Sequence, residues 1–235
     1  MKKTLLLAAC CFLGIQAALA QETEVTQITV TETTVKNEKP YGLYVGFGAV
    51  FMGDYNLNEK LAQSNMPEIG SVAPEFTFGF TFTEPGEKLY MDVEATGAYM
   101  DKKSDTDRIK TTTGMAKMRI HYKFFGNNKW FFSAGGDISY NITQVNLYSR
   151  TNVIDLNSLN PSAHTGHISM YSQQLTLGPS VALGFCRDMT FPLRLHVGYD
   201  IGLTNGKWKS EFANINNTVK ENGLGRIYAK LIIDL

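Results

Sequence analysis

The sequence has little cysteine and no excess of charge of either sign. It holds 3 Cys in 235 residues, and 22 Lys+Arg stand against 22 Asp+Glu. Balanced charge excludes the strongly basic surface with which proteins bind nucleic acid, so we expect no nucleic-acid partner. A hydrophobic content of 43% excludes a disordered chain. A mean hydropathy of -0.15 excludes a protein built of many membrane helices.

Long apolar runs are also missing, except at the start of the chain. Lys2 and Lys3 precede an apolar run over 5–18, and Ala18-Leu19-Ala20 forms a small-x-small cleavage site. This pattern predicts a secretory signal peptide over residues 1–20, and therefore export. The alternative is a lipobox ending at Cys10, where the chain would be lipidated. The apolar stretch before that residue is shorter than the ~7–15 residues such a signal needs.

Cleavage after residue 20 would remove Cys10 and Cys11 and leave only Cys186. A single thiol permits no intramolecular disulfide, so the exported chain must be stabilised in another way. Residues 21–40 are rich in Thr, Glu and Val and contain few large apolar side chains. We predict a polar periplasmic lead-in there.

From residue 41 to 235 the hydrophobic pattern has a period of two, as in β-strands. Every second residue is uncharged in eight segments, and many of these residues are large and apolar. The segments are 43–51, 76–82, 89–99, 114–124, 130–142, 175–185, 193–201 and 227–235. Aromatic residues gather near both ends of the apolar face, as in the two aromatic girdles of a lipid-facing barrel.

The opposite face of the same segments combines ionic side chains with many Gly, Ser and Ala residues. Small residues of this kind are typical of a narrow enclosed interior. The sequence therefore predicts an all-β fold, an eight-stranded antiparallel up-and-down transmembrane β-barrel over 41–235. A soluble sandwich or a lipocalin-like barrel would also alternate, but its polar face would be rich in Lys, Glu and Thr.

Links between the segments alternate in length. Those after the second, fourth and sixth segments are short, and the others, over 54–70, 101–111, 144–172 and 203–223, are long. Short periplasmic turns and long external loops are typical of outer-membrane barrels, and they put both chain ends on the periplasmic side. Pro179 supplies no N–H to a strand ladder, so we expect it at a bulge or near a strand end.

Eight strands leave an interior just wide enough to be filled by side chains. We predict that the inward charges pair with one another and plug the lumen. Hairpin register brings Asp92 and Glu94 near Lys117 and Arg119, Asp137 near Lys117, Arg194 near Asp234, and Asp200 near Arg226. The predicted network comprises Glu75, Asp92, Glu94, Lys117, Arg119, Asp137, Arg194, Asp200, Arg226, Lys230 and Asp234.

Other motifs give weak chemical signals. His121 and His196 face the interior, and we favour hydrogen-bonded structural histidines over a proton relay or a metal site. His164 and His167 stand three apart without a Cys or carboxylate beside them, which is a poor metal signature. Lys207-Trp208-Lys209 is compatible with contact to lipopolysaccharide phosphates, or with a solvated loop that holds one packed Trp. We predict no catalytic residue, no metal and no cofactor.

Together, the signal peptide, the eight amphipathic segments, the alternating links and the strand at the C-terminus resemble the small eight-stranded outer-membrane proteins, the OmpA-barrel and OmpX-like group. The Thr/Glu-rich lead-in and aromatic-dense strands look most like the outer-membrane β-barrel family of Bacteroidota. The resemblance implies a Gram-negative outer membrane, with its lipid, its lipopolysaccharide and the barrel-assembly machinery as partners. Such barrels commonly end in an aromatic residue, whereas this chain ends in Leu235.

These observations favour a monomer with a structural, envelope-integrity role, or one that contacts a surface or host ligand through its long loops. The first alternative is a small conduit or binder for a solute or a lipid. The second is a lipid-modifying barrel enzyme. Against an enzyme, no Ser–His or Cys–His pair occurs on the apolar face.

Overall fold

The computed structural model describes residues 41–84, 86–150, 166–187, 189–216 and 219–235. The predicted signal peptide, the lead-in over 21–40 and the alternative lipidation at Cys10 lie outside these residues. In the described part of the chain, no helix has the length and apolar character needed to cross a membrane.

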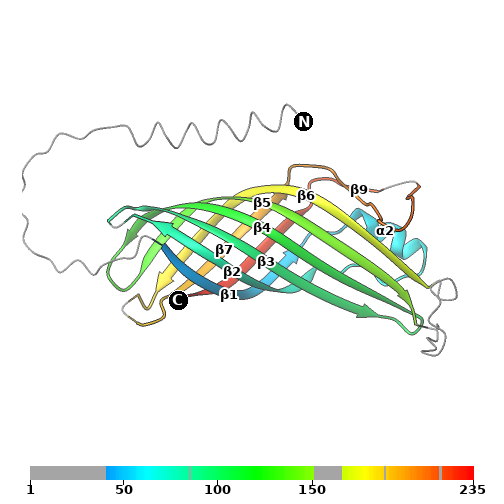
Figure 1. Cartoon of the computed structure of the whole chain (residues 1–235), viewed down its shortest axis with the longest axis horizontal. Coiled ribbons are helices and arrows are strands. Elements are labelled where there is room, and N and C mark those ends of the chain that lie inside the picture. The colour runs from blue at the N-terminus through cyan, green and yellow to red at the C-terminus, as the bar shows by residue number, and fades with distance from the viewer. Residues whose placement is uncertain (1–40, 85, 151–165, 188, 217–218) are drawn as a thin grey trace, which may run out of the picture. The chain divides into compact units, whose positions relative to one another are not determined.

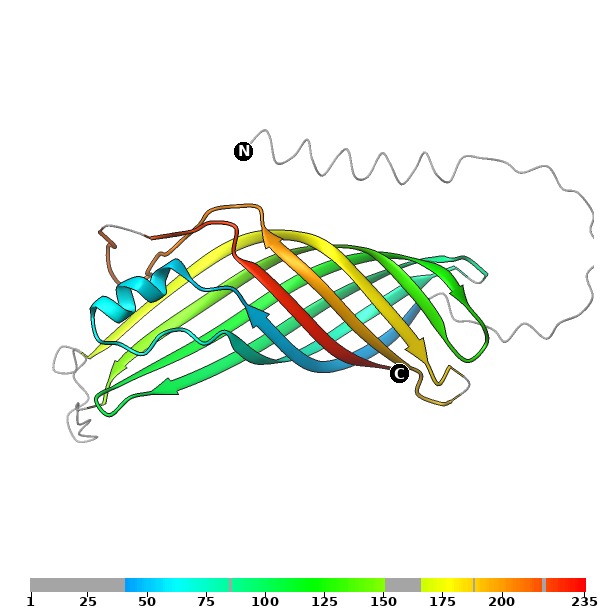
Figure 2. The same ribbon diagram turned by 180° about the vertical axis from the view of Figure 1, so that it is seen from behind.

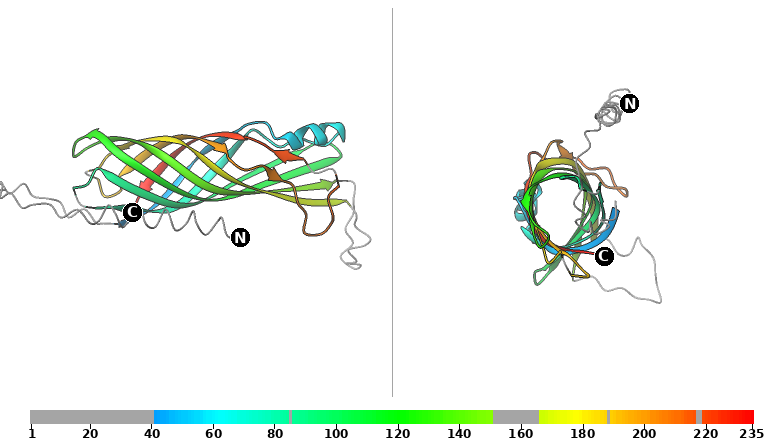
Figure 3. Two further views of the ribbon diagram at one scale, coloured as in Figure 1. Left: turned by 90° about the horizontal axis from the view of Figure 1, so that it is seen from above. Right: turned by 90° about the vertical axis from the view of Figure 1, so that its left-hand side faces the viewer.

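Eight long strands close into one antiparallel barrel in the order β1-β10-β7-β6-β5-β4-β3-β2 (Figure 1). The end-on view of Figure 3 looks into the ring that they form. The predicted fold class is therefore confirmed. The strands are β1 (Tyr41–Met52), β2 (Val72–Thr83), β3 (Leu89–Lys103), β4 (Asp107–Gly126), β5 (Phe131–Ser149), β6 (His167–Phe185), β7 (Leu193–Gly202) and β10 (Gly225–Asp234).

Alternation along each strand separates a lipid-type exterior from a polar interior. In β2, the outward Phe76 is 68% exposed, whereas its neighbour Glu75 is 1% exposed. Outward Phe78 and Phe80 continue the same exposed row. Because successive side chains of a strand point to opposite faces, this pattern turns the apolar face outward on every strand.

Closure of the barrel depends on the pairing of its first and last strands. β1 and β10 pair from Tyr44 with Asp234 to Met52 with Arg226, in an unbroken antiparallel register. Hydrocarbon offers no hydrogen bonds to a free strand edge, so only a closed ladder satisfies every strand. The predicted pairing of the eighth segment with the first is confirmed.

Pro179 lies inside β6, and the prediction of a bulge or a strand end is wrong. Leu177 pairs with Ile201 and Ser180 with Gly198 in one register, while Gly178 and Pro179 between them have no partner in β7. Both residues keep their partners in β5. The proline therefore interrupts the ladder on one side only and leaves the register intact.

We call the end with the three short links the turn end and the opposite end the loop end. At the loop end, the strands run further than the apolar pattern predicted. β3 and β4 are joined by residues 104–106 alone, so most of the predicted loop 101–111 is paired strand. Asp101 and Arg108 form an exposed ion pair at 2.5 Å across this hairpin. Cross-strand pairs of this kind stabilise a ladder beyond its apolar part.

Two further elements lie in the predicted loops at this end. Helix α2 (Asn56–Gln63) occupies the link 54–70, as the cyan coil in Figure 2 shows. Strands β8 (Gly206–Lys207) and β9 (Lys220–Glu221) pair within the link 203–223. β5 and β6 also extend to Ser149 and from His167, well inside the predicted link 144–172. The described parts of these links therefore contain helix and strand.

Candidate functional site

The centre of the lumen is filled by ionic side chains from six strands. The predicted residues all lie on the inward face, and all are buried except Asp234, whose side chain is 29% exposed. Five cations face six acids in this space. The group comprises Glu75 of β2, Asp92 and Glu94 of β3, Lys117 and Arg119 of β4, Asp137 of β5, Arg194 and Asp200 of β7, and Arg226, Lys230 and Asp234 of β10.

Arg119 and Asp137 lie at the middle of this group. Arg119 donates from Nε to Asp137 Oδ1 at 3.0 Å, and its terminal nitrogens lie 3.4 Å from Asp92 and from Glu94. Lys117 Nζ lies 2.9 Å from Asp137 and 2.9 Å from Asp200. Each of these charges therefore faces at least one opposite charge, which a buried ion requires.

Hairpin register also predicted the neighbours of the arginines near the barrel ends. Arg194 lies 2.7 Å from Asp234, and Arg226 Nε lies 3.8 Å from Asp200. The structure thus brings together the residues that the register placed side by side. Glu94 and Lys117 stand opposite each other in the ladder as predicted.

Several ion pairs join strands that are not neighbours, and the sequence did not reveal them. Lys230 Nζ lies 2.5 Å from Glu94, and Arg194 lies 3.1 Å from Asp92. Arg226 lies 3.0 Å from Glu75. The pairs of Lys230 with Glu94, of Arg194 with Asp92 and of Lys117 with Asp200 cross the lumen, whereas Arg226 reaches Glu75 past the single strand β1.

Two inward tyrosines add hydrogen bonds to the acids. Tyr44 donates to Glu94 at 3.0 Å, while Tyr228 donates to Asp137 and accepts from Arg119 at 3.1 Å. A Cβ on Gly79 or Gly198 would lie 2.4 Å from the ring of Tyr44 or the hydroxyl of Tyr228, respectively. The small residues of the interior face therefore make room for the large ones.

The two inward histidines stack on each other but differ in their hydrogen bonds. Their ring centroids are 5.7 Å apart, at an angle of 11°. His121 bonds Ser180 at 2.7 Å and Ser133 at 3.1 Å, as a structural histidine does. Among the described residues, neither ring nitrogen of the buried His196 has a partner. The preference for hydrogen-bonded histidines is thus correct for His121 and wrong for His196, which faces Ala182 and Lys230 in its ladders.

Aromatic rings and cations close the turn end of the lumen. Phe131 is buried there, with Lys123 Nζ 5.5 Å and the Arg187 guanidinium 5.4 Å from its ring centroid. Lys123 also lies 5.6 Å from the ring of Tyr90. Cation–π contacts of this kind stabilise a charge that lies over an aromatic ring.

An apolar core closes the loop end. Leu57 and Leu61 of α2 pack with Trp208 and with inward residues of the strands. We call α2 together with β8 and β9 the lid. Leu57 and Leu61 are four residues apart and therefore lie on one face of a helix. This spacing is a short helical pattern that the sequence already contained. The strand residues of this core are Val50, Met52, Ala73, Ala98, Ile109, Val145, Leu147 and Tyr228.

Glu221 of β9 holds the lid together. Its carboxylate accepts from the backbone N–H groups of Asn56 and Leu57, at 2.7 and 3.0 Å, and from Trp208 Nε1 at 2.7 Å. Free N–H groups at a helix N-terminus favour a negative charge. Glu221 is buried, and the sequence did not identify it because its partners in α2 lie more than 150 positions away. The Trp of the Lys207-Trp208-Lys209 motif is thus a packed residue.

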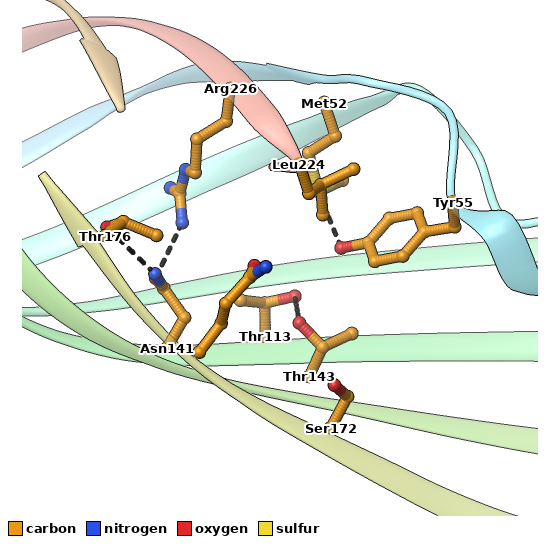
Figure 4. A pocket seen from close by; sticks show the side chains of 10 residues that line it. Met52, Tyr55, Thr113, Asn141, Thr143, Ser172, Thr176, Leu224 and Arg226 are labelled. Carbon is orange, nitrogen blue, oxygen red and sulfur yellow. Dashed lines mark hydrogen bonds between the residues drawn. The ribbon is translucent and has the colours of Figure 1, made fainter. Parts of the chain in front are cut away.

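A small cavity lies between the lid and the charged network (Figure 4). About 20 Å³ of it is open to the centre of a water molecule, room for roughly one water. Asn141 bonds Thr176 and Arg226 in its wall, and Thr113 bonds Thr143. Burial raises the pKa of Tyr55 in the lid above its ordinary value, so this phenol stays neutral.

Within the described ranges, no group of three or more His, Cys, Asp or Glu side chains could hold a metal ion. His164 of the His164–His167 motif lies outside those ranges. His167 stacks on Tyr148 with ring centroids 4.6 Å apart.

Comparison with known proteins shows the fold. The chain matches no protein-family model and no curated protein sequence. It is similar to a crystal structure of a major outer membrane protein from Thermus thermophilus, with a TM-score of 0.51 and 12% identity, over 84% of this chain and 100% of that one. The fold is that of a small outer-membrane β-barrel.

Two other solved barrels are similar at lower scores. The attachment invasion locus protein Ail of Yersinia pestis has a TM-score of 0.46 and 8% identity, over 83% of this chain and 97% of that one. Neisserial surface protein A has a TM-score of 0.44 and 14% identity, over 83% and 98%. The fold alone does not decide whether an outer-membrane barrel is an enzyme.

Proposed function

We propose that this outer-membrane barrel is a closed, monomeric envelope protein that conducts no solute, and that its ordered loop end serves envelope integrity or contact with a surface ligand. The observation that carries the proposal is the set of buried ion pairs that cross the lumen. Lys117 with Asp200, Lys230 with Glu94 and Arg194 with Asp92 join opposite walls at 2.5 to 3.1 Å.

Two further layers support a closed barrel. Above the ion pairs lies the apolar core of the lid, and below them lies the aromatic layer at Phe131. A solute would have to displace all three layers in order to pass. The cavity under the lid has room for only about one water molecule.

Single-channel recording in planar bilayers tests the proposal. We expect the wild type to show no porin-like conductance. Replacing Glu94 and Lys230 together with Ala removes an ion pair without leaving either charge unpaired, and it opens space beside Arg119. We expect this double variant to fold and to leak small ions.

A matched control is the double variant Asp101→Ala/Arg108→Ala, which removes an exposed ion pair at the loop end. This control variant should show no more conductance than the wild type. Steady conductance of the wild-type barrel would contradict the proposal and favour a conduit. A mass change of lipid A on deletion of the gene would favour a lipid-modifying enzyme instead.

A further inference from the structure

The link between β7 and β10 runs along the outside of the barrel wall at the loop end, as the brown segment in Figure 3 shows. Lys209 pairs with Tyr171 of β6 through two backbone hydrogen bonds, of 2.8 and 2.9 Å. Trp208 points into the core of the lid, so the flanking Lys207 and Lys209 are exposed. The chain then continues to Glu211 and Phe212 over the outer face of β5 and β6.

A groove of about 340 Å³ separates Glu211 and Phe212 from the barrel wall. Its walls are Ile142 and Gln144 of β5 and Ser169, Tyr171 and Gln173 of β6. The groove is independent of the lumen, because all these strand residues lie on the outward face.

The groove lies where the apolar band of the barrel ends. Ile142 is the last aliphatic residue of the outward row of β5, and Gln144 follows it. On β6, the outward row changes from apolar to polar between Leu175 and Gln173. One end of the groove therefore lies at the depth of acyl chains and the other at the depth of lipid headgroups.

Phe212 is 83% exposed, although it is a large apolar residue. It lines the groove together with Ile142, which belongs to the lipid-facing row. An exposed aromatic at this depth is stable against lipid, where aromatic residues of membrane proteins gather. Contact with lipid would therefore explain why the Phe212 side chain is exposed.

The polar wall suits a headgroup rich in hydroxyl and amide donors. Gln144, Gln173 and Tyr171 offer neutral donors and acceptors, and Gln144 already bonds Ser169 at 3.2 Å. The carboxylate of Glu211 accepts hydroxyl donors and repels a phosphate. The groove chemistry therefore favours a sugar over a phosphoglycerol headgroup.

We infer that this groove binds one acylated sugar lipid of the outer leaflet, with an acyl chain against Ile142 and Phe212 and sugar hydroxyls on Gln144, Gln173 and Glu211. The inference goes beyond the proposed function, since it concerns the outer wall and holds whether or not the lumen conducts.

A fluorescence experiment places Phe212 relative to the membrane. The variant Phe212→Trp is made together with Trp130→Phe, because Trp130 is exposed on the outer face, while Trp208 is buried in the lid. In vesicles of phosphatidylcholine brominated near the headgroup, the new indole should be quenched strongly. An indole that is not quenched and emits as if fully hydrated overturns the inference.

Native mass spectrometry then tests the ligand. The folded protein is incubated with equal amounts of a neutral glycolipid, monogalactosyldiacylglycerol, and of phosphatidylglycerol, and the retained lipid is counted. We expect the wild type to retain the neutral glycolipid preferentially, and Phe212→Ser to retain roughly tenfold less of it. Phe191→Ser, in a turn at the other end of the barrel, is the matched control and should bind as the wild type does. Equal retention of both lipids by the wild type, or unchanged retention by Phe212→Ser, overturns the inference.

Discussion

At the scale of single residues, Asp137 has the largest number of polar partners among the described acids of the lumen. It faces Arg119 at 3.0 Å and Lys117 at 2.9 Å, and it accepts from Ser180 at 2.5 Å and from Tyr228. A carboxylate in this position compensates two buried cations at once. Removing its charge therefore leaves both cations short of a partner.

We expect Asp137→Asn to lower the free energy of unfolding by about 3–5 kcal/mol, the usual effect of breaking a buried ion pair from one side. Reversible urea unfolding in lipid vesicles measures the change. Asp101→Asn serves as the control, because it breaks an exposed pair with Arg108 that contributes little. If both variants lost the same stability, the burial of the network would not matter energetically.

At the scale of elements, the eight strands could be predicted because alternation is a local pattern that each segment displays by itself. The partners of Lys117 and Arg194 within hairpins followed from register. The contacts of Lys230 with Glu94 and of Glu221 with α2 could not be predicted, because they depend on the curvature of the whole barrel. The loop-end strands also escaped detection, since Asp101 and Lys110 interrupt the apolar alternation that signals a strand.

Loss of the Glu221 carboxylate should loosen the lid. Glu221→Ala removes the acceptor of two helix N–H groups and of the Trp208 indole. Loss of a helix cap costs roughly 1–2 kcal/mol, which is enough to let α2 open locally in an otherwise folded barrel. We expect faster trypsin cleavage at Lys60, followed by mass spectrometry, with no change in the SDS-resistant form of the barrel.

Glu211→Ala is the matched control for this experiment, because Glu211 belongs to the same link but is exposed. Its cleavage rate at Lys60 should equal that of the wild type. Equal rates in Glu221→Ala and the wild type would show that the apolar packing of Leu57 and Leu61 holds the lid without the carboxylate.

At the scale of the whole molecule, the alternating links give the barrel a direction in the membrane. The turn end holds Tyr41, the C-terminal Leu235 and the three short links, and the loop end holds the lid. We expect the loop end to face the exterior of the cell. In a Cys186→Ser background, Asp105→Cys should react in intact cells with a maleimide that cannot cross the membrane, and Asn128→Cys only after permeabilisation. The opposite labelling would reverse the orientation.

Closure of the barrel by β10 has a consequence for biogenesis. The last strand of the barrel carries Arg226 and Lys230, which pair with Glu75, and Lys230 also pairs with Glu94. Until this strand docks, Glu75 lacks both Arg226 and Lys230, and Glu94 keeps only Arg119 of its two ion-pair partners. Sealing of the ladder and the last step in neutralising the interior thus coincide, and we expect a barrel that lacks β10 to be unstable in the membrane.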